Sequence, residues 1–338
     1  MSTSPANHPV NIQLGIDLGG SKIEIIALAP CNQNSDQSRI ILRERLATPA
    51  DCGNASDRYQ KILNAIGELV DAAEQQLKES VNFPYTSTLG IGIPGAISPQ
   101  SGLVKNANTT CLIGQPFADD LKSQLNRDLL IANDADCFVL SEASDGAGKE
   151  GKSVFGVIIG TGCGGGLVIN NQLVSGPNAI AGEWGHNPLP WANATDQMNA
   201  CYCGQSGCIE TFLSGPGFSQ HANRLFASSE TLNAKQWHQA LLENQPQAIE
   251  AYDLYTDWLA RGLASVINIL DPDIIVLGGG MSNVDYLYQH LPDKLTRYVF
   301  SDSVQTRIVK AQHGDSSGVR GAAWLGASAV SDDGFLPP

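Results

Sequence analysis

The same order of elements begins twice in this chain of 338 residues: an apolar strand, a glycine turn and a second strand. The first copy has alternating apolar residues over 12–18, the turn Gly19-Gly20 and a strand over 23–28. The second copy has a strand over 154–159, five glycines within 160–166 and a strand over 167–169. This recurrence predicts a duplicated α/β architecture, and a chain of this length can bury two cores.

Other segments extend each copy. A strand over 40–46 would complete an antiparallel meander, and Ser56 is expected to cap a helix over 57–78. Asn170-Asn171 predicts a two-residue hairpin, because asparagine tolerates positive φ. We expect further helices at 116–126, 134–143, 247–270, 282–295 and 317–327, and further strands at 89–93, 129–132, 274–277 and 306–309.

The domain plan follows from this order of elements. We predict a polar tail over 1–11, an N-terminal α/β domain over 12–132 and a C-terminal α/β domain over 133–338. The last helix, 317–327, is expected to pack back on the first domain.

Composition excludes some classes of protein. The formal net charge is −14, which is unlike the basic surface of a nucleic-acid binder. The first residues lack a secretory pattern, and every apolar run is too short to span a bilayer. We therefore expect a soluble, cytoplasmic protein without nucleic-acid or membrane partners.

Three glycine turns each follow an apolar strand. Glycine lets backbone N–H groups approach a phosphate, and a carboxylate at a strand end can order Mg²⁺ through water. Taken singly, the first and third turns are explained equally well as ordinary tight connections. Together the three turns favour a nucleotide site, whose candidate residues are Asp17, Gly19, Gly20, Ser21, Lys22, Gly160, Thr161, Gly162, Gly278, Gly279 and Gly280.

Four potential metal ligands are clustered after the second copy begins. Cys201, Cys203 and Cys208 follow His186, and three thiolates with one imidazole make a closed tetrahedral Zn²⁺ site. Such a site is structural, because it leaves no open position. The alternative is three unrelated reduced thiols, which fits the turn glycines between the cysteines less well.

Carboxylates provide the candidate chemistry. Asp134 follows Asn133 where a short strand passes into a helix, so either residue is a candidate helix cap or Asp134 a base aimed at a sugar hydroxyl. Glu183 and Glu210 flank the cysteine cluster. They are candidate acceptors for sugar hydroxyls, with surface salt bridging as the alternative.

These segments together resemble the ROK family of bacterial sugar kinases. The most specific is Cys-x-Cys-Gly-x-x-Gly-Cys-x-Glu after Glu-x-Gly-His. The resemblance implies a two-domain actin-like, hexokinase-like (ribonuclease H-like) α/β fold with an interdomain cleft. It also implies ATP with Mg²⁺ as phosphoryl donor, a structural Zn²⁺ and a homodimer. The matching segments are 17–22, 92–95, 133–135, 160–166, 182–186, 201–210 and 277–282.

The resemblance also implies roles for single residues. Asp134 is similar in position to the family's catalytic base, and residues 17–22 and 160–162 to its phosphate loops. Residues 278–280 correspond to the adenosine segment. Sugar contacts correspond to Asn108, Asn133, Glu183, His186 and Glu210, with His186 also a zinc ligand.

Within the family, residues 104–110, 184–191 and 313–324 resemble bacterial fructokinases with mannokinase activity. This resemblance predicts ATP-dependent phosphorylation of the 6-hydroxyl of a free hexose, fructose and/or mannose. The alternatives are an N-acetylglucosamine kinase or glucokinase of the same family, an actin-like ATPase, and a sugar-responsive transcriptional regulator. The regulator needs a DNA-binding segment before the first strand, for which we expect no room. His313 and Asp315 receive no role.

Overall fold

The computed structural model describes residues 9–30, 38–50, 54–226 and 231–328. Cys31, Cys52 and most of the predicted tail lie outside these residues. The chain forms two compact units. Unit 1 consists of Met1–Asp145, Ser175–Ala179 and Ser316–Pro338, and unit 2 of Gly146–Val174 and Ile180–Asp315. The domain boundary after residue 132 stays a prediction.

Unit 1 is built on a five-stranded sheet in the order β3-β2-β1-β4-β7. The first three strands pair antiparallel, which confirms the predicted meander, and β4 and β7 continue parallel to β1. The strands are β1 (Val10–Leu18), β2 (Lys22–Pro30), β3 (Ser38–Ala47), β4 (Tyr85–Ile93) and β7 (Leu130–Asn133).

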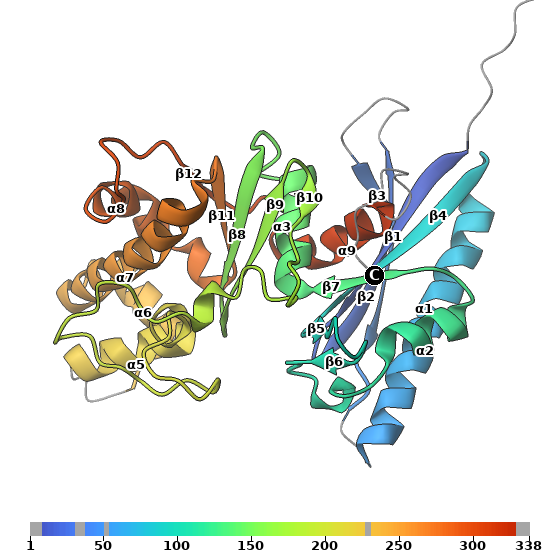
Figure 1. Ribbon diagram of the computed structural model, residues 1–338, viewed down its shortest axis with the longest axis horizontal. Helices are drawn as coiled ribbons and strands as arrows, with labels where there is room; N and C mark the ends of the chain where they lie inside the picture. The colour runs from blue at the N-terminus through green and yellow to red at the C-terminus, as the bar shows by residue number, and fades with distance from the viewer. Residues whose placement is uncertain (1–8, 31–37, 51–53, 227–230, 329–338) are drawn as a thin grey trace, which may run out of the picture. The chain divides into compact units, whose positions relative to one another are not determined.

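Helices cover both faces of this sheet. Helices α1 (Ala55–Ser80) and α2 (Phe117–Leu125) lie on one side, and α9 (Ser317–Ser328) lies on the other beside α3 (Asp134–Ser144) (Figure 1). Helix α1 begins earlier than predicted. Asn54 is its N-cap and accepts a hydrogen bond from Asp57 N at 2.8 Å, so the prediction that Ser56 caps it was wrong. Both residues are good N-caps, and Asn54 comes first.

Helix α9 packs closely on the strands of unit 1. A Cβ atom at Gly15 or Gly90 would collide with α9 backbone, and one at Gly321 of α9 would collide with the Cys137 carbonyl of α3. Gly15 and Gly90 are therefore required by the close approach of α9 to the sheet, and Gly321 by its close approach to α3.

Unit 2 repeats the same opening. Its sheet has the order β10-β9-β8-β11-β12, with an antiparallel β8–β9 pair and β11 parallel to β8 and β12. The hairpin at Asn170-Asn171 is confirmed, with φ of 50° and 62°. The strands are β8 (Ser153–Ile159), β9 (Cys163–Ile169), β10 (Gln172–Leu173), β11 (Ile274–Gly278) and β12 (Arg307–Lys310).

The helices of unit 2 enclose its core. Tyr252 and Tyr255 of the long helix α7 are fully buried and pack against Phe218. The predicted helix over 282–295 begins later, because the 3₁₀ turn η3 (Gly280–Asn283) precedes it. The α-helices are α4 (Glu210–Leu213), α5 (Gly215–Phe226), α6 (Ala234–Leu242), α7 (Pro246–Leu270) and α8 (Asp285–Leu295).

Short elements complete the two units. Strands β5 (Ala96–Ile97) and β6 (Val104–Lys105) form a small pair. The remaining 3₁₀ turns are η1 (Thr110–Leu112), η2 (Trp184–His186) and η4 (Gly314–Ser316). In the parts of the chain that the structure describes, no helix has the length and apolar character that a membrane span requires.

Candidate active site

The unit 1 part of the candidate site lies at the carboxyl ends of β1, β4 and β7. Asp17, next to last in β1, pairs with Glu24 of β2 and Gly92 of β4. Asn133 ends β7, and Asp134 begins α3. Ligands of α/β sheets bind beyond the carboxyl ends of parallel strands, so these side chains lie where a site is expected.

Asp17 and Asp134 interact electrostatically. Burial and the negative charge of Asp134 raise the pKa of Asp17 from 3.8 to about 6, and Lys22 only partly offsets this. A divalent cation beside Asp17 would favour the ionised form of this carboxyl.

The start of α3 combines capping with exposure. Asn133 is the N-cap, and its Oδ1 accepts a hydrogen bond from Ala135 N at 2.8 Å. Asp134 Oδ1 accepts from the same N–H at 2.8 Å, while the Asp134 side chain is exposed. The capping interpretation therefore holds for Asn133, and the adjacent Asp134 is exposed.

Asn108 lies on the same edge of unit 1 as Asn133. Its backbone N–H donates to Pro94 O at 3.0 Å, and Asn133 Nδ2 donates to Gly95 O at 3.3 Å. The Pro94-Gly95 turn after β4 thus holds both asparagines, and the Asn108 side chain is exposed.

Sequence reasoning missed the environment of Lys22. Its Nζ donates to Glu24 Oε2 at 3.0 Å, and the buried Glu24 also forms ion pairs with Arg43 and Arg45 of β3. Burial would raise the pKa of Glu24, but hydrogen bonds from Arg45, Lys22 and Arg43 hold it below its usual value. Only the register of β2 against β3 brings Arg43 and Arg45 to Glu24.

In unit 2 the two predicted nucleotide segments are neighbours. Gly278 pairs with Ile158, and a Cβ at Gly160 would lie 3.9 Å from Gly280 N. Gly279 has φ of 83°, which favours glycine. A Cβ at Gly280 would meet nothing within 4 Å, so space for a ligand remains beside it.

The glycines of 160–166 are explained by two different structural requirements. The turn is confined to 160–162, because β9 begins at Cys163 and the following glycines pair with β8. A Cβ at Gly165 would lie 2.8 Å from Gly182 O. Close approach of the chain's own backbone therefore explains Gly165, which leaves 160–162 as the candidate phosphate turn.

The four predicted metal ligands converge in unit 2. The donor atoms of His186, Cys201, Cys203 and Cys208 all lie within 4.8 Å of one another. Cys201 Sγ is 3.6 Å from His186 Nδ1, and Cys203 Sγ is 3.6 Å from Cys208 Sγ. A tetrahedron with Zn–S bonds of about 2.3 Å has edges of about 3.6–3.8 Å, so the donor set fits zinc.

One thiol of this cluster favours its charged form. The backbone N–H of Gln205, with help from the neighbouring thiols and His186, lowers the pKa of Cys203 to about 7. Thiolate is the form that binds metal.

A second anchor holds the cysteine loop, and sequence reasoning missed it. Asp196 Oδ2 accepts from Arg261 Nη1 of α7 at 2.7 Å, and Asp196 Oδ1 accepts from Trp258 Nε1 at 2.8 Å. Both partners of the ion pair are buried, with side-chain exposures of 4% and 3%. The residues are 65 positions apart, so no local pattern reveals the pair.

Tyr202 of unit 2 is influenced by all three predicted sugar contacts of this unit, His186 by contact and Glu183 and Glu210 through their charges. Its hydroxyl lies 3.0 Å from His186 Nε2. The ring is largely exposed, but partial burial of the hydroxyl and the charges of Glu210 and Glu183 raise the pKa of Tyr202 to about 12. Glu210 also reaches the glycine turn, where its Oε2 accepts from Cys163 N at 2.8 Å.

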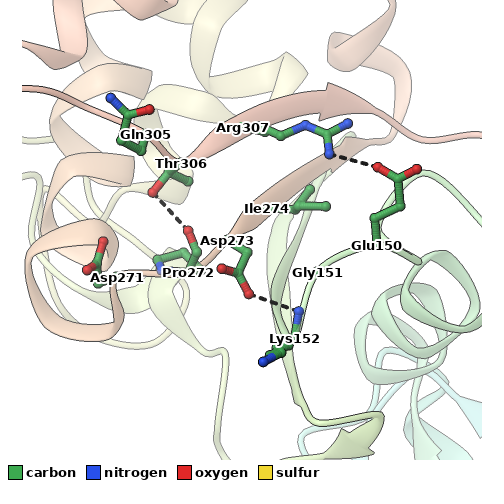
Figure 2. A pocket seen from close by; sticks show the side chains of 10 residues that line it. All are labelled: Glu150, Gly151, Lys152, Asp271, Pro272, Asp273, Ile274, Gln305, Thr306 and Arg307. Atoms are coloured by element: carbon green, nitrogen blue, oxygen red, sulfur yellow. Dashed lines mark hydrogen bonds and ion pairs between the residues drawn. The ribbon is translucent and has the colours of Figure 1, made fainter.

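A separate pocket lies at the opposite ends of the unit 2 strands (Figure 2). There Asp273 accepts from Lys152 N at 2.8 Å, and Arg307 pairs with Glu150 at 3.0 Å. These charges are satisfied within the protein, and the glycine turns follow the other ends of the same strands. The pocket is therefore not part of the candidate active site.

Two units that each open with strand, glycine turn and strand define the actin-like, hexokinase-like class of two-domain α/β proteins. The match to the ROK family covers residues 13–329, and the chain belongs to this family.

Similar proteins refine the class. The N-acetyl-D-glucosamine kinase of Vibrio cholerae is 38% identical over 316 residues, covering 92% of this chain and 98% of that protein. The N-acetyl-D-glucosamine kinase of Pectobacterium atrosepticum is 39% identical over 318 residues, covering 92% and 97%. The solved ROK hexokinase of Thermus thermophilus has a TM-score of 0.79 at 25% identity, covering 95% of this chain and 99% of that one. The chain is thus a sugar kinase of the ROK family.

Proposed function

We propose that this kinase phosphorylates the 6-hydroxyl of a free hexose, with N-acetylglucosamine as the leading substrate. The contact of Glu210 with the glycine turn supports the sugar site, as does the influence of Glu183, His186 and Glu210 on Tyr202. Relatives named as N-acetyl-D-glucosamine kinases favour this sugar over the fructose and mannose predicted from the sequence. Fructose, mannose and glucose remain the rival substrates.

In unit 1, Asp134 is the proposed general base. A sugar hydroxyl is too weak an acid to ionise unaided, so a positioned carboxylate accepts its proton as the phosphoryl group transfers. Asp134 is exposed at the first turn of α3, where a substrate hydroxyl can reach it. Asn108 and Asn133 are proposed to donate hydrogen bonds that orient the sugar.

The glycine turns are proposed to hold ATP. Residues 160–162 and the Gly19–Lys22 turn would contact phosphates, and residues 278–280 would contact the adenosine. Magnesium bound with ATP would neutralise charge on the phosphates, and Asp17 would orient it through water. Most of the acceleration is expected from positioning, since phosphoryl transfer to a hydroxyl needs no covalent enzyme intermediate.

His186 Nδ1 and the three cysteine thiolates are proposed to hold a structural Zn²⁺. The ion would cross-link the cysteine loop to the Glu183–His186 segment. With Nδ1 directed to the cluster, His186 presents Nε2 to Tyr202 and to a sugar hydroxyl. Metal-bound histidines commonly use their second nitrogen in this way.

The test is sugar-dependent ADP release. We expect kcat/KM to be higher for N-acetylglucosamine than for fructose, mannose or glucose. Asp134→Asn should lower kcat by about 10²–10⁴-fold, the range for a lost general base, and leave the Kd for sugar within about threefold.

Asp128→Asn is the matched control for this test, because Asp128 is an exposed carboxylate just before β7. It should retain wild-type turnover. Turnover of Asp134→Asn near the wild-type value would refute the role of Asp134. Release of ADP that no sugar stimulates would refute the proposed function.

A further inference from the structure

The two carboxylate oxygens of Glu210 have different surroundings in unit 2. Glu210 is the first residue of α4, two residues after Cys208. Its Oε2 accepts a hydrogen bond from the backbone N–H of Cys163, at the end of the glycine turn, at 2.8 Å. Its other oxygen, Oε1, accepts no hydrogen bond from any residue that the structure describes. One oxygen is therefore committed to the turn, while the other is open to a ligand.

The glycine turn and the start of α4 are attached at further points. A Cβ at Gly162 would lie 2.8 Å from Glu210 Oε2. The Gly160 carbonyl accepts from Gly215 N, just after α4, at 2.7 Å. Gly160 N in turn donates to Gly162 O at 3.0 Å, which closes the turn. The Glu210 carboxylate therefore contacts the turn at Gly162 and Cys163, while backbone bonds hold its beginning.

We propose that Glu210 is a positioning residue for the phosphate-binding turn as well as a sugar contact, so that sugar and nucleotide bind to unit 2 cooperatively. This inference rests on the proposed function. A sugar hydroxyl on Oε1 restricts rotation of the carboxylate that also holds Cys163 N–H. The nucleotide then meets a turn that is already ordered, and linkage requires that nucleotide tighten sugar binding by the same factor.

The first experiment compares Glu210→Ala with Glu210→Gln. Kd is measured for a non-hydrolysable ATP analogue and for N-acetylglucosamine, each with and without the other. Alanine removes the acceptor for Cys163 N–H, so Kd for the analogue should rise about tenfold, as for a hydrogen bond to a charged group. Glutamine can still accept with its amide oxygen and should return this Kd to within about threefold of wild type. A purely structural role would not give this rescue for the nucleotide alone.

The second experiment approaches the contact from the turn. Gly162→Ala should push the carboxylate aside and raise Kd for the sugar at least about fivefold, although Gly162 belongs to the proposed phosphate loop. Gly160→Ala is the matched control, because its nearest contact would be an ordinary 3.9 Å from Gly280 N. It should leave sugar Kd within about twofold, whatever it does to the nucleotide.

The outcomes separate the two proposals. Wild-type protein without sugar-dependent ADP release would overturn the proposed function and this inference with it. Sugar-dependent release together with wild-type analogue Kd in Glu210→Ala would overturn the inference alone. Unchanged sugar Kd in a folded Gly162→Ala would do the same. Should Gly162→Ala fail to fold, the Glu210 pair decides.

Discussion

Asp17 carries a charge that its surroundings disfavour. Its raised pKa, about 6, comes first from burial and then from Asp134. Below about pH 4 the group is protonated in both the folded and the unfolded chain. Between about pH 4 and 6 the folded protein retains the proton that the unfolded chain releases. The resulting contribution to the free energy of unfolding is therefore present at low pH and lost as pH rises through 6.

Asp17→Asn should remove the destabilisation that the buried Asp17 charge causes above pH 6. A shift of about two pKa units corresponds to at most about 3 kcal/mol, so we expect the variant to gain about 1–3 kcal/mol at pH 8 and almost nothing at pH 4. Urea unfolding in magnesium-free and nucleotide-free buffer measures the difference, with Asp128→Asn as control. The same variant should lose kinase activity. An equal gain at both pH values would show that the charge is not the cause.

Features that depend on neighbouring residues in the sequence were predictable, whereas pairs of residues far apart in the sequence were not. Asn170-Asn171 and the Cys201–Cys208 spacing are read within a few positions of the chain. Glu24 meets Arg43 and Arg45 only through strand register, which depends on the whole sheet. Asp134 was proposed as a candidate because a strand end and a helix start were predicted to coincide there, and the structure has β7 end at Asn133 and α3 begin at Asp134.

At the scale of elements, a buried ion pair anchors the cysteine loop. Asp196 lies in a segment with few buried apolar side chains, and the bidentate bonds of Arg261 fasten it to α7. Asp257 of the same helix also pairs with Arg261, at 2.9 Å. Removing one partner of a buried pair leaves the other charge without compensation.

Arg261→Leu should therefore lower the free energy of unfolding by about 3–5 kcal/mol. Arg307→Leu is the control, because the Arg307–Glu150 pair is exposed, with exposures of 56% and 68%, and should cost no more than about 1 kcal/mol. Denaturant unfolding of zinc-loaded protein compares them. Similar losses in both variants would mean that the buried pair does not anchor the loop.

The sequence pattern also explains which elements were foreseen. Strands β1, β2 and β8 alternate or run apolar, and their ranges were predicted to within two or three residues. Helices α4, α5 and α6 were not predicted: α4 has only four residues, whereas α5 and α6 have buried apolar positions that the sequence reasoning missed. They are stabilised by packing on α7, which is a tertiary effect.

For the whole molecule, the important fact is that each unit has its own buried core. One core joins β1, β4 and α1 in unit 1, and the other joins β8, β11 and α7 in unit 2. Helix α9, from the end of the chain, packs on the unit 1 sheet. Separate cores allow each unit to be destabilised without direct change in the other.

Two treatments should therefore affect different calorimetric transitions. Purified protein should hold about one zinc per chain. A chelator should lower the melting temperature of the unit 2 transition, because the metal binds the folded unit and not the unfolded chain. Gly90→Ala should lower the unit 1 transition, because the added Cβ forces α9 away from β4. Limited proteolysis during heating assigns each transition to its unit. The assignment of the metal cluster to an independently stabilised unit 2 would be contradicted by a chelator that shifts neither transition. It would also be contradicted if the chelator and Gly90→Ala shifted the same transition.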